Sequence, residues 1–302
     1  MQAKKEIKGI NPVLAATFNS DGSLDLESMA KLIEHEINIG ANGVTMFGIA
    51  SEFHKLTDKE KDALAALVVS MTRPTKTYCV LSVTDHSTEV AVERAKYYEK
   101  LGADCLMVLP PFFLNPSIEQ IKEHIFSILN AVSIPVLVQY APGETKKIIP
   151  VEEMAIIKNK YKNAIFKLEP NPPMEYVKGM LNLAPDATIL IGYAGLYMLE
   201  VMDVGGKGTM PGCSFTEIYL AIEKLWVDGQ KETAHILHSK LMKYIQKWMS
   251  HPEYIIKIEK VILHKRGIIA SDYCRKPEWT LNNQDLIDID EFLKEFSMLL
   301  NH

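Results

Sequence analysis

Several features that mark common functional classes are missing from this sequence. Its 302 residues include only four cysteines, which are far apart and show no CxxC spacing, so we predict neither a disulfide framework nor a thiol metal site. No apolar run approaches the roughly 18 residues of a membrane span. There is no GxxxxGK[ST] phosphate loop, no HxxxH pair and no acidic cluster with the spacing of metal ligands. We therefore predict no membrane segment, no metal and no cofactor.

An excess of positive charge is also missing. The net charge is -5 at pH 7 and the sequence pI is about 6.0, which argues against nucleic acid or an anionic membrane as the main partner. The opening residues MQAKKE are not followed by an apolar stretch, so we predict no signal peptide and a cytoplasmic location. The composition, 47% hydrophobic and 24% charged, is typical of a soluble globular protein.

Short apolar runs alternate with amphipathic segments along most of the chain. We predict strands at residues 10–18, 43–47, 77–83, 103–109, 135–140, 163–170, 188–191 and 208–210. The predicted helices that follow them cover residues 26–39, 57–71, 87–101, 117–132, 150–161, 173–183, 196–204 and 214–227. Eight such units predict an α/β fold, a (β/α)₈ TIM barrel with a parallel sheet. The alternative, an open doubly wound sheet, would need a Gly-rich phosphate turn after the first strand, and Asn19-Ser20-Asp21-Gly22 is not one.

The alternation ends near residue 228. We therefore predict a catalytic barrel domain at residues 1–228 and a C-terminal helical region at residues 229–302, with helices at 230–250, 253–265 and 286–300. The first of these helices carries an apolar stripe of Ile236, Leu237, Leu241, Tyr244 and Ile245. Such helices either cover the barrel or form a contact between subunits, and the sequence leaves both possibilities open.

The predicted sixth strand carries the most reactive pattern in the chain. With a period of two, Lys167 and Glu169 share one face near the C-terminal end of this strand, and that end forms the active-site face of a parallel barrel. Desolvation lowers the pKa of a lysine, and its neutral amine can attack a carbonyl to form a Schiff base. A structural ion pair between the two residues is the competing interpretation.

The loop after the second strand has the composition of an anion-binding turn. Glycine allows a tight turn, successive backbone amides can surround a carboxylate, and a serine adds a hydroxyl donor. The competing interpretation is an ordinary strand-to-helix turn. We predict that this loop binds substrate through Gly48, Ile49, Ala50, Ser51 and Glu52.

Further candidates follow other strands. His86 comes after the third strand, although a single histidine near a loop is more often a surface or packed residue. Gln139 and Tyr140 end the fifth strand, where a tyrosine could act as a general acid and a glutamine as a hydrogen-bond partner. Because adjacent strand residues face opposite ways, at most one of them points inward. Gly192 and Thr209 lie in small-residue turns that leave room for a ligand.

Five stretches in this order and spacing resemble the dihydrodipicolinate synthase/N-acetylneuraminate lyase superfamily, over about residues 8 to 298. They are Ala16-Thr17-Phe18, Gly48 to Glu52 with Leu56 to Glu60, Pro110-Pro111, Ile134 to Pro142, and Phe166-Lys167. The resemblance implies a class I Schiff-base lyase on a (β/α)₈ barrel with a C-terminal helical region, usually a homotetramer. It also implies a small 2-keto acid as substrate, Lys167 as the Schiff-base lysine and the Gly48 loop as the site of the keto-acid carboxylate.

Within the superfamily the sequence departs from the synthase. The tyrosine, threonine and partner-subunit tyrosine of the synthase proton relay fall on Gln139, Ala50 and Phe113, and the arginine for the aldehyde's carboxylate falls on Glu144. The sequence is more similar to L-2-keto-3-deoxyarabonate dehydratase-like members. The shared residues are Ser51-Glu52, Gln139, Lys167-Leu168-Glu169 and the stretch Lys265 to Ser271.

The resemblance therefore implies dehydration of a 2-keto-3-deoxy sugar acid through an iminium on Lys167. Glu169 would act as base or acid, Gln139 would orient a hydroxyl or water, and His86 would contact the distal end of the substrate. Aldol condensation or cleavage with pyruvate, of the dihydrodipicolinate synthase or N-acetylneuraminate lyase type, is an alternative. The synthase route would need Tyr140 to turn inward through a bulge. A non-enzymatic member that binds a keto acid is a further alternative.

Overall fold

Eight strands alternate with helices in the computed structural model, which describes residues 5–300. The strands are β1 (Gly9–Ile10), β2 (Gly43–Met46), β3 (Tyr78–Ser82), β4 (Cys105–Val108), β5 (Val136–Tyr140), β6 (Ala164–Leu168), β7 (Ile189–Ile191) and β8 (Gly208–Thr209). The helices up to β8 are α1 (Leu26–Asn38), α2 (Asp58–Thr72), α3 (Thr88–Leu101), α4 (Ile118–Ala131), α5 (Pro142–Thr145), α6 (Val151–Lys160), α7 (Met174–Leu183) and α8 (Met198–Asp203). The later helices are α9 (Thr216–Val227), α10 (Lys231–Trp248), α11 (Pro252–Lys265), α12 (Asn283–Glu295) and α13 (Ser297–Leu300).

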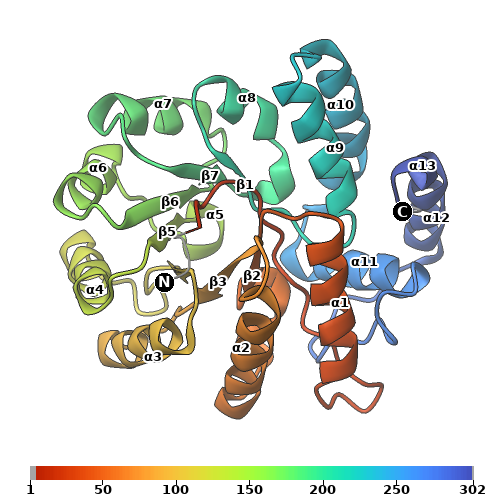
Figure 1. Cartoon of the computed structure of the whole chain (residues 1–302), viewed down its shortest axis with the longest axis horizontal. Helices are drawn as coiled ribbons and strands as arrows, with labels where there is room; N and C mark the ends of the chain where they lie inside the picture. Colours follow the sequence, from red (N-terminus) through yellow and green to blue (C-terminus); the bar gives the residue numbers. More distant parts are fainter. Residues whose placement is uncertain (1–4, 301–302) are drawn as a thin grey trace. The chain divides into compact units, whose positions relative to one another are not determined.

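The chain forms two compact units, of which the first contains Tyr78–Thr209 and the residues up to Lys8. In this unit β3 to β8 are parallel, and each pairs with the next strand along the chain. Figure 1 shows β5, β6 and β7 side by side. Every residue of these strands is buried, as expected for a parallel sheet that is covered on both faces.

Among the described residues, the second unit contains Gly9–Thr77 and residues 210–300. Its residue Val13 forms one parallel bridge to Thr45 of β2 and another to Gly212, just beyond β8. The N-terminal segment thus lies between the second strand and the continuation of the eighth, which is how a sheet closes on itself. The fold is therefore the predicted (β/α)₈ TIM barrel with a C-terminal helical extension. Figure 1 shows α9 and α10 of this unit packed together.

Side chains and a glycine cap the ends of α2 and α3. Thr57 accepts a hydrogen bond from the backbone N–H of Glu60, and the Glu60 carboxylate accepts one from the N–H of Thr57. Ser87 caps α3, and Gly102 ends that helix with a φ of 111°. Glycine adopts this left-handed backbone conformation at little cost in free energy, so the helix can end there.

The first predicted strand, residues 10–18, was wrong in extent. Regular pairing stops after Ile10, and only isolated bridges at Val13 and Phe18 follow. Pro12 has no backbone N–H to donate to a ladder, so an unbroken strand cannot run through it. The bridge at Val13 still uses its N–H, which donates to the carbonyl of Pro211.

Two helical predictions also need correction, and one short helix was not predicted. The predicted helix 286–300 starts earlier, at a capping box of Asn282 and Asp285, and is divided into α12 and α13 at Phe296. The predicted helix 196–204 is reduced to α8, because a 3₁₀ turn (η3, Tyr193–Gly195) precedes it. The short helix α5 was not predicted.

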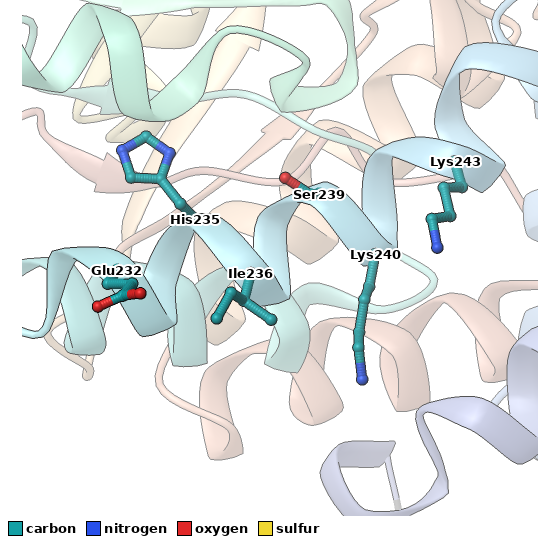
Figure 2. Close-up of a pocket in the computed structure, with 6 residues that line it drawn as sticks. All are labelled: Glu232, His235, Ile236, Ser239, Lys240 and Lys243. Atoms are coloured by element: carbon teal, nitrogen blue, oxygen red, sulfur yellow. The ribbon is translucent and has the colours of Figure 1, made fainter.

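The apolar stripe predicted on α10 is shifted around the helix. Leu241 and Ile245 are buried as predicted, together with Ala234, His238 and Trp248. Ile236 is 56% exposed instead. Figure 2 shows it on an exposed face with Glu232, His235, Ser239, Lys240 and Lys243, which line a shallow hollow formed by this one helix. The error arose because the charged and polar residues of this helix leave its apolar period ambiguous.

The predicted division into residues 1–228 and 229–302 stays a prediction, since the two compact units divide the chain at other positions. Within residues 5–300 no helix is both long and apolar enough to cross a membrane. Residues 1–4, to which the signal-peptide prediction partly refers, lie outside the described residues.

Candidate active site

Lys167 lies in the middle of the parallel sheet of the first unit. Its strand β6 is paired on both sides, with Gln139 of β5 and Leu190 of β7 in register with Lys167. Only 6% of the lysine's surface is exposed. A nearly buried amine next to the carboxyl end of a barrel strand has the location expected of a Schiff-base nucleophile.

Glu169, two residues further on, directs its carboxylate back to the lysine. Its Oε1 lies 3.3 Å from Lys167 Nζ, and its Oε2 accepts a hydrogen bond of 2.6 Å from Gln139 Nε2. The backbone N–H of Tyr193 also donates to Oε1, at 3.3 Å. The carboxylate is thus fixed by three groups from β5, β6 and the turn after β7, and it faces the amine.

The backbone of Gly192 lies directly against this carboxylate. A Cβ atom added at Gly192 would lie 1.9 Å from Glu169 Oε1, so no other residue fits without displacing the carboxylate. Tyr193 and Ala194, which follow, have φ values of 51° and 46°. Non-glycine residues in this left-handed region cost on the order of 1–3 kcal/mol each, and they concentrate at functional sites.

Tyr140, the other residue at the end of β5, faces away from Lys167. Its ring stacks on Tyr176 of α7 with the ring centroids 4.7 Å apart. The pairing of β5 with β6 continues without interruption from Val136 to Tyr140, so no bulge turns Tyr140 inward. Gln139 is therefore the residue of this pair that meets the lysine and the glutamate.

Two acidic groups near the lysine were not among the predicted site residues. Partial desolvation by the surrounding groups and the charge of Glu169 raise the pKa of Glu144 above its usual range, even though part of the residue is exposed. Burial, followed by the charges of Glu144 and Glu169, raises the pKa of Tyr193 to about 12. Both groups therefore hold their protons more firmly than free side chains do. The Tyr193 hydroxyl lies over Gly143, whose added Cβ would be 2.8 Å from it.

His86 and Thr209 are not part of this cluster. His86 lines a recess of about 340 Å³ with residues of the α3 start, the Pro111 loop and α4, and its ring lies 4.9 Å from that of Phe112. None of the residues that line this recess is Lys167, Glu169 or Gln139. The buried hydroxyl of Thr209 donates to the carbonyl of Ile191 at 3.0 Å, which ties β8 to β7. Substrate roles for both residues stay predictions.

The predicted carboxylate-binding loop belongs to the second unit. Gly48 begins a 3₁₀ turn (η1, Ile49–Ser51), and a Cβ added to it would lie 2.7 Å from Val13 Cγ1. Ser51 donates its hydroxyl to the carbonyl of Leu14 at 2.6 Å and its amide to the carbonyl of Gly48 at 3.0 Å. For the backbone N–H groups of Ile49 and Ala50, no hydrogen bond occurs within residues 5–300. These two amides are the donors that a ligand could use.

Glu52 is fully buried and engaged within its own unit. Its carboxylate pairs with Lys260 and Lys55 and accepts the backbone N–H of Arg275. The side chain thus supports the loop, and its predicted contact with substrate stays a prediction. Among residues 5–300, no three His, Cys, Asp or Glu side chains gather closely enough to hold a metal ion.

The sequence could identify the face of β6 and the end of β5, because both follow from a period of two. Tyr193 could not be found in this way, since its role depends on a left-handed backbone that sequence patterns reserve for glycine. Glu144 lies in a short helix that carries no periodic signal. Its only sequence mark was the charge reversal at a position where the synthase carries arginine.

Comparison with known proteins places these features in a family. Among curated proteins, the chain is 25% identical to the L-2-keto-3-deoxyarabonate dehydratase of Azospirillum brasilense over 89% of its length and 88% of that protein. It is 23% identical to the probable 2-dehydro-3-deoxy-D-pentonate aldolase YjhH of Escherichia coli (strain K12), over 90% of its length and 92% of that protein.

Among solved structures, the dihydrodipicolinate synthase of Rhodopseudomonas palustris superposes with a TM-score of 0.88 at 24% identity. The match covers 97% of this chain and 99% of that one, and it supports the fold. The family model described as "Dihydrodipicolinate synthetase family" matches residues 6–296. The curated relatives are named as a dehydratase, a probable aldolase and 4-hydroxy-tetrahydrodipicolinate synthases. The chain therefore belongs to the dihydrodipicolinate synthetase family of lyases.

Proposed function

We propose that the protein is a Schiff-base-forming dehydratase of a 2-keto-3-deoxy sugar acid. The observation that carries the proposal is the Lys167–Glu169–Gln139 cluster, in which one carboxylate is held 3.3 Å from the amine and 2.6 Å from the amide. By the sequence resemblance, Gln139 stands at the position of the synthase's strand-five tyrosine. The similarity to the Azospirillum brasilense dehydratase over most of both chains supports the same reaction class.

The reaction begins with Lys167. Glu169 takes a proton from the lysine ammonium, and the freed amine adds to the C2 carbonyl carbon of the substrate. That proton leaves with the C2 hydroxyl as water, which gives an iminium and returns Glu169 to its charged form. The iminium withdraws electrons and so acidifies the C3 protons.

Glu169 then acts at C3 and C4. It takes a C3 proton as base, and the electron pair of the resulting enamine expels the C4 hydroxyl, which departs as water with the proton that Glu169 carries. The product at this stage is an iminium with a C3=C4 double bond. Loss of a C5 proton and gain of a proton at C3 move the double bond to C4–C5 and give an enol. Water then hydrolyses the iminium and restores the lysine, and the released enol tautomerises to the aldehyde of 2-oxoglutarate semialdehyde. Gln139 holds Glu169 in place and orients a substrate hydroxyl or a water. For the Gly48 loop, the proposal assigns the backbone N–H groups of Ile49 and Ala50 to the substrate carboxylate.

Borohydride trapping tests the nucleophile. Reduction in the presence of pyruvate is expected to leave one stable adduct, which peptide mass spectrometry assigns to Lys167. Lys167→Ala should lose this adduct. Lys158→Ala is the control, since Lys158 is also a nearly buried lysine of the same unit but bonds to the Lys162 carbonyl. This variant should keep the adduct. A wild-type protein without an adduct would disprove the Schiff-base proposal.

Product analysis separates dehydration from aldol cleavage. With 2-keto-3-deoxy-pentonates we expect 2-oxoglutarate semialdehyde and no pyruvate. Release of pyruvate would instead establish an aldolase, the second candidate, which the similarity to the Escherichia coli protein supports. An adduct without turnover of any sugar acid would favour a synthase or a keto-acid-binding member.

A further inference from the structure

Groups of the C-terminal helical extension hold the predicted carboxylate-binding loop at its buried end. The Glu52 carboxylate binds the ammonium of Lys260, which comes from α11, and neither side chain is exposed. Its other oxygen accepts the backbone N–H of Arg275 at 3.2 Å and the Lys55 ammonium at 3.1 Å. All of these residues lie in the second unit.

The contact belongs to a network with balanced charge. Arg275 pairs with Glu60, and its Nη1 donates to the carbonyl of Lys55 at 2.7 Å. Lys55 also binds Glu253 of α11 at 2.8 Å. Three carboxylates and three cations thus meet around the end of one loop. A polar network of this kind is rigid when every member has its partners. Loss of one partner leaves a buried charge without compensation, which destabilises the structure.

The two main cations are also fixed by an aromatic ring. Lys260 Nζ and the Arg275 guanidinium each lie 4.5 Å from the centre of the Phe18 ring. Lys260 Nζ donates a further hydrogen bond of 2.9 Å to the carbonyl of Tyr273. With these partners filled, neither cation is available to bind a substrate, so any effect on substrate must pass through the loop.

The loop needs this support because its backbone is strained at both ends. Phe47, directly before the loop, and Glu52, its last residue, have φ values of 68° and 50°. Non-glycine residues hold such conformations only when their surroundings enforce them. The network binds the carboxylate of Glu52, the residue with this strained backbone. These contacts therefore set the direction in which the amides of Ile49 and Ala50 point.

We propose that Lys260 and Arg275 are positioning residues, through which the C-terminal extension sets the loop for a substrate carboxylate. The proposal rests on the carboxylate assignment made under the proposed function. It gives the extension a role within its own subunit, beyond covering the barrel or joining subunits. Its consequence is that selectivity for the carboxylate depends on residues that do not touch the substrate.

Lys260→Met tests the proposal by comparing two probes of the same shape. Pyruvate carries the carboxylate, and pyruvamide replaces it with a neutral amide. We expect the pyruvate concentration for half-maximal borohydride trapping to rise at least tenfold, while the value for pyruvamide changes less than twofold. An unchanged pyruvate value in a folded variant would overturn the proposal.

Lys257→Met is the matched control. Lys257 lies one turn earlier on α11, and its ammonium donates to the carbonyl of Asp272 at 3.0 Å. This variant also removes an ammonium from α11 but leaves the partners of Glu52 in place, so it should keep the wild-type selectivity between pyruvate and pyruvamide. Equal losses of selectivity in both variants would mean that general destabilisation is the cause, and would also overturn the proposal.

A double variant, Glu52→Gln with Lys260→Met, decides the matter if the single variant does not fold. It removes both charges and leaves neither one unpaired in the interior. It should fold and show the same loss of pyruvate selectivity, and wild-type selectivity in it would contradict the proposal. Failure of the proposed function looks different, because then the wild-type protein itself forms no adduct with pyruvate.

Discussion

The absence of a side chain at Gly192 allows the Glu169 carboxylate to lie close to Lys167. Because a Cβ at Gly192 would lie 1.9 Å from Glu169 Oε1, Gly192→Ala must push the carboxylate away from Lys167. We expect turnover to fall by about 10²- to 10⁴-fold, the usual contribution of a placed acid–base group. The pyruvate adduct should still form on Lys167, although more slowly. Steady-state kinetics and intact-mass analysis of the trapped protein measure the two effects.

Gly179→Ala provides the control for this substitution. Gly179 lies in α7 of the same unit, and its added Cβ would meet Val151 at an ordinary 3.4 Å. Alanine also favours a helix over glycine. Turnover should therefore stay near the wild-type value. Normal turnover in Gly192→Ala would show that Glu169 is not the base.

The carboxyl group of Glu259 makes stability depend on pH. It is buried in α11 and accepts the backbone N–H of Cys213 at 3.1 Å, and burial raises its pKa to about 8. The folded protein therefore keeps this proton between about pH 4.5 and 8, whereas the unfolded chain loses it. The stabilisation is complete below the unfolded pKa and is lost as the pH rises to about 8, on the order of a few kcal/mol.

Glu259→Gln should remove this dependence, because the amide stays neutral and can still accept the Cys213 hydrogen bond. The measurement is the free energy of unfolding in urea at pH 5 and pH 8. The wild-type protein is expected to lose more stability than the variant over this interval. Burial also raises the pKa of Glu36, and the charge of Glu259 adds to that rise, so part of the Glu36 effect disappears with Glu259 and widens the expected difference. Parallel pH profiles would contradict the prediction.

At the scale of single residues, the sequence supports predictions wherever a strand's alternation fixes the face. Lys167, Glu169 and Gln139 meet as that alternation requires. The partners of Glu52 were not predictable, because Lys260 and Arg275 lie more than 200 residues further along the chain. No local pattern connects positions so far apart.

Strand β5 offers a comparison between neighbouring residues on opposite faces. Gln139 bonds to Glu169, whereas Tyr140 stacks on Tyr176. Tyr140→Phe should keep turnover within about twofold, because it leaves the stacked ring in place. Gln139→Met should lower turnover at least tenfold, because Glu169 loses a hydrogen bond to a charged group, worth about 1.5–3 kcal/mol. Steady-state rates on the same sugar acid measure both, and loss of turnover in Tyr140→Phe would revive the synthase interpretation.

Whole elements were predictable where their ends carry chemical signals. Helices α2 and α3 start directly after Thr57 and Ser87, whose side chains cap them, and the predicted ranges begin at these two residues. The start of α12 was missed even though Asn282 and Asp285 form a capping box, because the apolar pattern begins only at Leu286. Strand β1 was overestimated, since apolar composition does not reveal which backbone groups find partners.

For the whole molecule, the homotetramer stays a prediction. Phe113, Leu114 and Ile148 are large apolar side chains of the first unit that remain exposed in the single chain. Burial of such groups between copies would be favourable at about 25 cal/mol per Å². Light scattering should give a mass four times the 34.0 kDa of one chain. A mass of one chain across the micromolar range would contradict the prediction.

The fold class itself was open to prediction, because eight alternations of strand and helix leave few architectures. The two compact units were not, since no change of composition marks their boundaries at Lys8, Thr77 and Thr209. Those boundaries depend on contacts between segments that are far apart in the sequence.

These boundaries determine the order in which the two units can form as the chain is synthesised. Most of the first unit is the continuous stretch Tyr78–Thr209, which leaves the ribosome in one piece. The second unit consists of an early part, Gly9–Thr77, and a late part that begins at Met210. At 5–20 residues per second, the early part waits roughly ten seconds for its partner. The strained loop at Gly48 is therefore made early and gains its supporting cations last, so a nascent chain would carry its lysine nucleophile before it could recognise an acid.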